Sequence, residues 1–185
     1  ISNMEFIYIQ NLRNKKHFWY MIVFEEKLRE LVAFLPQTAD GFTIRYDWGT
    51  IDVLNKFLIL PENKSKYPLI WLVTGSDTDN FTTKSNNRRV KLVLATASND
   101  VDQFNQVQYQ TDYLNILLPI YKDLHTLFIK SGITTLIDDE IAKEMKPNFS
   151  FKNNEKGLID IWNALFLEFE LVIDGKKCIN KNIKF

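Results

Sequence analysis

The sequence predicts a small α+β domain, in which a mainly antiparallel sheet is packed on one face by a long helix and by an N-terminal helix. The first observation is an alternation near the C-terminus, where every second side chain is apolar: Leu165, Leu167, Phe169, Leu171 and Ile173. Glu168, Glu170 and Asp174 lie between them, which is typical of a half-buried strand. The second observation is the helical spacing of apolar residues across 106–130. An apolar sheet face needs an apolar cover, so we expect this helix to lie on it.

The length and composition fit one domain with one core. The chain has 185 residues, and its 23 basic residues balance 23 acidic ones, so no net charge draws it to nucleic acid or a membrane. Aromatic residues make up 14% of the chain, which either a Phe-rich core or an interface explains. Cys178 is the only cysteine. This excludes an intramolecular disulfide and a cysteine zinc cluster, and it indicates a reducing compartment.

We divide the chain into an N-terminal segment of residues 1–20, a single α+β domain of residues 21–179 and a basic tail of residues 180–185. The first segment is either upstream sequence read before a natural start at Met21, or an arm that packs its aromatic residues on a neighbouring subunit. The apolar run at 17–24 is too short to span a bilayer and lacks a small-residue cleavage site. We therefore do not expect export.

The first predicted elements are short. Apolar residues at helical spacing predict a helix over about 22–35, and Pro36 ends it. Residues 38–41 indicate a turn and 42–46 a short strand. Residues 51–60 fit a helix or a strand, and we favour a short helix.

The middle of the chain predicts two strands. Residues 69–73 form an unbroken apolar run, which indicates a strand covered on both faces, either within the chain or by a neighbour. Residues 76–87 indicate a solvated loop. Arg88 and Arg89 then open a strand that ends near Thr96, with apolar residues at alternate positions.

The long helix of residues 106–130 contains Pro119, which we expect to kink or split it, because proline lacks a backbone donor. Ser131 and Gly132 end the helix. Residues 140–151 then indicate an extended segment broken at Pro147, and 152–157 a polar turn before the last strand.

The sequence contains few residue patterns that indicate a catalytic, metal-binding or phosphate-binding site. Asp77 with Asp79, and Asp100 with Asp102, have a spacing that suits a divalent cation, but turn and capping roles are favoured. Asp123 and His125 face different directions on the helix, which disfavours a triad with Ser131. The candidate phosphate contacts are weak and also fit solvated positions: Arg88, Arg89, Lys176 and Lys177. We expect no catalytic residue, cofactor or metal.

Three short motifs occur in order: YPLIWL at Tyr67–Leu72, DIWNAL at Asp160–Leu165, and Cys178 with Ile179. Together with the element order, this pattern resembles the tail terminator, or tail-completion, proteins of long-tailed bacteriophages, particularly those of Bacteroidetes-type phages and prophages. The resemblance covers about residues 21–179. Asn163 departs from it, since an Asp is expected there.

The resemblance implies a structural virion protein that forms a ring, commonly a hexamer, on the head-proximal end of the tail tube. Such a ring stops tube polymerisation and offers a surface to head–tail connector or neck proteins, after assembly in the host bacterial cytoplasm. The implied partners are further copies of the chain, the tube protein and the neck proteins. DNA only passes through the lumen, and no membrane is involved.

We hypothesise that Tyr67, Trp71 and Trp162 lie at or beside the subunit contact; a place in the core is an equal alternative. Alternative functions are a head–tail connector or a small nucleic-acid-binding module that uses Arg88, Arg89 and the basic tail. A metal-dependent enzyme built on Asp77 and Asp79 is least favoured.

Overall fold

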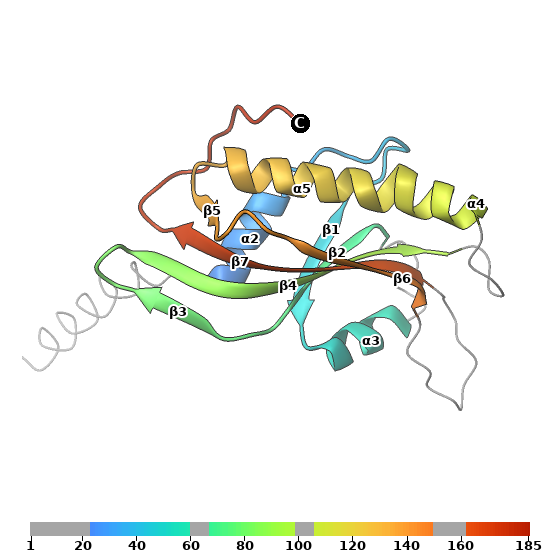
Figure 1. Ribbon diagram of the computed structural model, residues 1–185, viewed down its shortest axis with the longest axis horizontal. Coiled ribbons are helices and arrows are strands. Elements are labelled where there is room, and N and C mark those ends of the chain that lie inside the picture. Colours follow the sequence, from blue (N-terminus) through green and yellow to red (C-terminus); the bar gives the residue numbers. More distant parts are fainter. Residues whose placement is uncertain (1–22, 60–66, 99–105, 150–161) are drawn as a thin grey trace, which may run out of the picture.

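Two long antiparallel strands, β4 (Ser85–Ala97) and β7 (Trp162–Asp174), form the centre of the sheet in the computed structural model. The structure describes residues 23–59, 67–98, 106–149 and 162–185. The 13-residue register pairs Leu92 with Leu167, so apolar side chains of both strands project to the same face. Figure 1 shows this pair running across the whole sheet.

Five shorter strands complete a seven-stranded sheet of order β1-β2-β4-β7-β5, with β3 also paired to β4 and β6 to β7. These are β1 (Arg45–Gly49), β2 (Leu69–Val73), β3 (Asp77–Asn80), β5 (Thr134–Leu136) and β6 (Ala142–Phe149). Among the described strand pairs, β1–β2 alone is parallel. The predicted α+β class with a mainly antiparallel sheet is therefore confirmed.

Helices cover the first face of the sheet along its length. They are α2 (Phe24–Val32) and a continuous helical segment made of α4 (Gln106–Gln108), the π-helix η2 (Tyr109–Leu117) and α5 (Leu118–Lys130). Figure 1 shows α5 along one side of the sheet. The main core lies between, and it includes the predicted row of β7: Leu165, Leu167, Phe169, Leu171 and Ile173. The expected cover of the last strand by the long helix is confirmed.

Pro119 changes the hydrogen bonding of the long helix. Residues 109–117 are π-helical, and the N–H of Leu118 donates to the carbonyl of Tyr113, five residues earlier. Pro119 follows directly in the first turn of α5, where it has no N–H to donate to the carbonyls of the preceding turn. The predicted interruption is thus a switch from π to α hydrogen bonding. Ser131 and Gly132, with a φ of 76° at the glycine, follow the last turn as expected.

The second face is covered by α3 (Ile51–Ile59), which confirms the favoured helix for this stretch. Leu54 and Leu58 pack there against buried residues of β2, β4 and β7: Leu69, Trp71, Val93, Ala95, Trp162 and Ala164. Strand β2 is thus covered on both faces within the chain, one of the two alternatives for its apolar run.

Three local predictions need correction. The strand expected at 42–46 is β1 at Arg45–Gly49, because pairing with β2 sets its limits. The loop expected at 76–87 contains β3 and the start of β4, held by main-chain pairing that polar side chains do not reveal. Strand β5 was not predicted, since three residues are too short to show a period.

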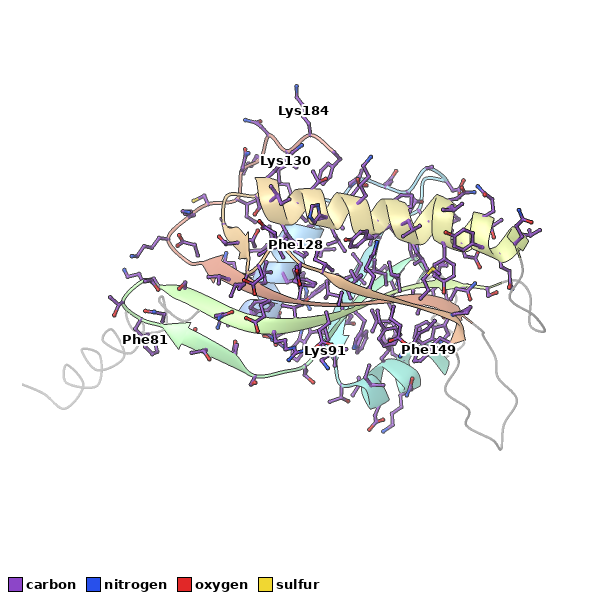
Figure 2. The ribbon with its side chains drawn as sticks, viewed as in Figure 1. Phe81, Lys91, Phe128, Lys130, Phe149 and Lys184 are labelled. Atoms are coloured by element: carbon purple, nitrogen blue, oxygen red, sulfur yellow. The ribbon has the colours of Figure 1, made fainter. Side chains whose placement is uncertain are left out.

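The basic tail folds back on the end of α5. The N–H of Asn180 donates to the carbonyl of Ser131 at 2.8 Å, and Lys130 Nζ donates to the carbonyl of Lys184 at 2.9 Å. Figure 2 labels both lysines near this contact. The predictions for residues 1–20, 61–66, 100–102 and 152–157 lie outside the described residues.

Candidate interaction surface

Among the described residues, α3 is the only helix on the second face of the sheet, and it covers one end. Beyond α3, β4 and β7 present a surface that we call the open half-face: Arg89, Lys91, Phe166, Glu168, Glu170 and Val172. Val90 and Leu167, on the opposite face, are buried, so alternation directs their neighbours outward. The side chains of Arg89 and Lys91 are 69% and 59% exposed. Both strands therefore change from a core surface to a solvent surface along their length.

A groove of about 410 Å³ lies where the open half-face meets α3 and β6. Its apolar walls are Ile51, Val73 and Phe166, and all three are only partly buried. Its other lining residues are Lys91, Ala142, Lys143, Glu144, Lys146, Leu167 and Glu168. An apolar wall with a charged rim is the usual composition of a binding groove.

The charges around the groove are exposed ion pairs. Glu168 lies 2.6 Å from Arg89 Nε and 3.6 Å from Lys91 Nζ. Glu144 lies 3.2 Å from Lys146, whose ammonium is 4.4 Å from the centre of the Phe166 ring. Such pairs contribute little to stability in water, so exchange for charges on a partner has a small cost. The lining includes three lysines and two glutamates, but Lys143 directs its ammonium over the Tyr121 ring of α5 on the opposite face, so the charges that face the groove balance.

The floor of the groove rests on an aromatic cluster. Phe149 meets Trp162 and Phe166 edge to face, with ring centroids 4.6 and 5.0 Å apart. These contacts fix the Phe166 ring beside the opening. Figure 2 shows Phe149 and Lys91 on the α3 side of the sheet. One signal in the sequence pointed here, since Phe166 is a large apolar residue on the polar side of the last strand.

Two of the three hypothesised contact residues lie in the core. Trp71 and Trp162 are 1% and 3% exposed beneath α3, and Trp71 Nε1 donates to the carbonyl of Gly49 at 3.1 Å. Neither ring has surface to offer a second chain, so a direct contact through them is corrected to a core position. Tyr67 is partly buried against the same cluster. A subunit contact beside these residues stays a prediction.

Arg88 is buried, which corrects its assignment as a phosphate contact. Arg88 belongs to β4, where side chains alternate between the two faces, and it lies on the same face as Val90. Its side chain therefore points toward the helices and is 2% exposed. Its Nη1 lies 2.6 Å from Glu25 of α2, and its Nη2 donates to the carbonyl of Val73 at 3.2 Å. Arg88 therefore joins α2 to the sheet. The burial was not predictable because Glu25 is 63 residues away.

The other candidate phosphate contacts are exposed, and two of them have acidic neighbours. Arg89 pairs with Glu168, and Lys177 lies 3.6 Å from Asp174. Lys176 is exposed. These cations come from β4 and from the turn after β7, and they do not gather around Arg88.

The carboxylates expected to cap or turn the chain fasten a hairpin. Asn86 of β4 donates through its Nδ2 to Asp77 at 2.9 Å and to Asp79 at 3.0 Å. Within the described ranges, no three His, Cys, Asp or Glu side chains gather as a metal site would require. The Ser131 hydroxyl is buried 2.6 Å from that of Thr134, and the His125 ring packs against Tyr121.

Two of the titratable groups with shifted pKa values are tyrosines that anchor helices to strands. Burial raises the pKa of Tyr113 to about 12, and its hydroxyl donates to the carbonyl of Ala164 at 3.1 Å. Burial also raises the pKa of Tyr46, which donates to the carbonyl of Glu25. Both phenols are therefore protonated donors at neutral pH. Burial likewise raises the pKa of Asp123.

No protein-family model and no curated protein matches this sequence. Among the described helices, none has the length and apolar character needed to cross a membrane.

Proposed function

We propose that this chain is a structural protein that assembles into a ring on the head-proximal end of a phage tail tube, where it stops tube polymerisation and receives the neck proteins. The proposal combines the resemblance of the three ordered motifs to tail terminators with a surface suited to assembly. It assigns no catalytic step.

The observation that carries the proposal is the incomplete cover of the second face. The covered end buries Trp71 and Trp162, whereas the open half-face and its groove expose Val73 and Phe166 in part. Aromatic residues are enriched in contacts between subunits, and grooves with apolar walls accept apolar anchors. A ring needs such a surface on every subunit.

A sheet flanked by helices also suits a ring around a channel. Each subunit is stiff, because β4 and β7 pair over thirteen residues and helices pack on both sides. A stiff subunit keeps the angle between neighbours constant, and a constant angle is required for closure at a fixed number of copies. The family resemblance favours a ring of six copies.

The test is polymerisation of the tail tube protein of a long-tailed phage, with and without the chain. We expect tubes of limited length with a ring of density at one end in negative-stain electron microscopy. A control with bovine serum albumin at equal concentration should leave the length distribution unchanged. Tubes that grow equally long and bare with the chain present would overturn the proposal.

The same material distinguishes the two alternatives. A head–tail connector would bind isolated portal or neck proteins and leave the tube ends bare. A nucleic-acid-binding module would retain duplex DNA with an affinity that falls steeply with salt. The buried Arg88 and the paired Arg89 and Lys177 lead us to expect no such retention.

A further inference from the structure

The hairpin between β3 and β4 carries an aromatic side chain at its tip. Phe81 is 74% exposed, the highest value among the large apolar side chains in the described part of the chain. Its neighbours at the tip are polar: Asn80, Thr82, Thr83 and Lys84. A single Phe held in water at the end of a polar turn contributes no packing to its own core.

The tip is held in a defined shape. Asn80 Oδ1 accepts hydrogen bonds from the N–H groups of Thr82 and Thr83, both at 3.1 Å. The N–H of Gly175 donates to the carbonyl of Lys84 at 2.8 Å, which fixes the turn to the end of β7. Below the tip, Asn86 joins Asp77 and Asp79. A side chain presented on a fixed turn loses little conformational entropy when it binds.

The tip cannot reach the groove of its own chain. β3 is paired to β4 from Asp77 to Asn80, so the hairpin points away along β4. Lys91 in the groove lies six positions along β4 from Ser85, roughly 20 Å of extended chain. Figure 2 shows Phe81 at one end of the sheet and Phe149, beneath the groove, toward the other, with Lys91 between them. An occupant of this kind must come from another molecule.

We propose that Phe81 of one copy inserts into the groove of the next copy, between Val73 and Phe166. This contact rests on the proposed function, since it supplies the ring with its subunit interface. The charges permit it: Asp77, Asp79 and Lys84 give the tip and β3 a net charge of −1, and the charged side chains that face the groove balance, with Lys91 59% exposed among them. Arg89 and Glu170, which lie opposite each other beside the groove, add one charge of each sign.

The contact is heterologous, because each copy uses its tip on one neighbour and its groove on the other. A series of such contacts closes into a ring when the rotation between copies divides a full turn. A two-fold dimer would instead use the same patch on both copies. The arrangement thus predicts head-to-tail growth.

The first experiment is native mass spectrometry of the wild-type chain and two variants at equal concentration. We expect a closed oligomer for the wild type, loss of that oligomer to monomer for Phe81→Asp, and the wild-type oligomer for Phe42→Asp. Phe42 is the matched control, as it is also an exposed Phe, at 54%, in a turn away from the hairpin. Equal thermal melting temperatures would show that all three chains are folded.

The second experiment fills the groove. Ala142 is exposed on β6 and lines the groove, so Ala142→Trp should block it without opening the core. Alone, this variant should be monomeric. Mixed with Phe81→Asp, it should form a one-to-one heterodimer and nothing larger, because only one intact tip and one intact groove remain.

The outcomes separate this contact from the proposed function. An oligomer of Phe81→Asp equal to that of the wild type, or a wild-type chain that stays monomeric at 100-fold higher concentration, would overturn the contact. A Phe81-dependent ring that leaves tail tubes uncapped would uphold the contact and overturn the terminator function. Capped tubes with a ring that does not depend on Phe81 would uphold the terminator function and overturn the contact.

Discussion

The two faces of the sheet differ in how far their side chains are buried along the same strands. On the first face, the apolar row of β7 is buried from Leu165 to Ile173 under the helices. On the second, burial ends after Ala164, and the row continues with Phe166, Glu168 and Glu170, which are partly or fully exposed. The first face therefore holds the fold together. In the part of the chain that the structure describes, the second face is exposed to solvent beyond α3.

The largest expected effect comes from the covered face. Leu92 is fully buried there and pairs with Leu167 of β7. Leu92→Ala should lower the free energy of unfolding by about 2–5 kcal/mol, because it removes apolar contacts and leaves a cavity. Urea denaturation measures this. A loss below about 1 kcal/mol would mean that the helices do not pack tightly on this face.

A pH-dependent effect comes from Tyr113, which fastens η2 to β7 on the same face. Its pKa is about 12 in the folded chain, against the ordinary tyrosine value of 10.0, so its contribution is complete below pH 10 and is lost as the pH rises toward 12. Two pKa units correspond to roughly 2–3 kcal/mol. Urea midpoints from pH 9 to 12 should thus fall more steeply for the wild type than for Tyr113→Phe. Parallel pH curves for the two chains would contradict the assignment.

Substitutions under α3, on the covered half of the second face, should lower the free energy of unfolding by a smaller amount. A Cβ added at Gly49 would lie 2.9 Å from the ring of Trp71, which is held in the core by its hydrogen bond. Gly49→Ala should lower the free energy of unfolding by about 1–3 kcal/mol through this overlap. Gly75→Ala is the matched control, because its nearest contact is an ordinary 3.6 Å. Equal melting temperatures for both variants would show that α3 and Trp71 pack loosely.

The smallest effect is expected on the open half-face. Glu168→Gln removes an exposed ion-pair partner of Arg89 and Lys91, and the free energy of unfolding should change by no more than about 0.5 kcal/mol. The affinity between subunits, by contrast, should change, because the groove loses a negative charge. A stability loss as large as that of Leu92→Ala would remove the distinction between the two faces.

The strands with a clear apolar pattern were predictable from the sequence. Residues 69–73 form β2 at the predicted bounds, and the alternation after Leu165 matches the burial of β7. Each pattern lies within one short stretch of sequence, because it records which side chains of that strand face water and which face the core. The long helix was predictable for the same reason, although the π-helical pattern before Pro119 was not.

Elements held by distant partners were not predictable. β3 contains no apolar side chain, and its main-chain pairing with β4 leaves no periodic pattern in the sequence. The burial of Arg88 depends on Glu25, and the groove depends on β6 lying beside β7. The aromatic content fitted either a core or an interface, and Phe81, the most exposed large apolar side chain among the described residues, belongs to none of the motifs. Trp71 and Trp162, which belong to the motifs, are buried in the core.

Cysteine cross-linking between tip and groove tests head-to-tail assembly most directly. The exposed Cys178 is first replaced by Ser. Thr82→Cys, which leaves Phe81 in place beside it, and Ala142→Cys are then combined in one chain and oxidised. We expect a ladder of covalent multimers that ends at the size of the closed ring, and no such ladder from either single cysteine. A double variant that stays monomeric, or forms no more than the dimers of the single variants, would contradict the assembly proposed for this chain.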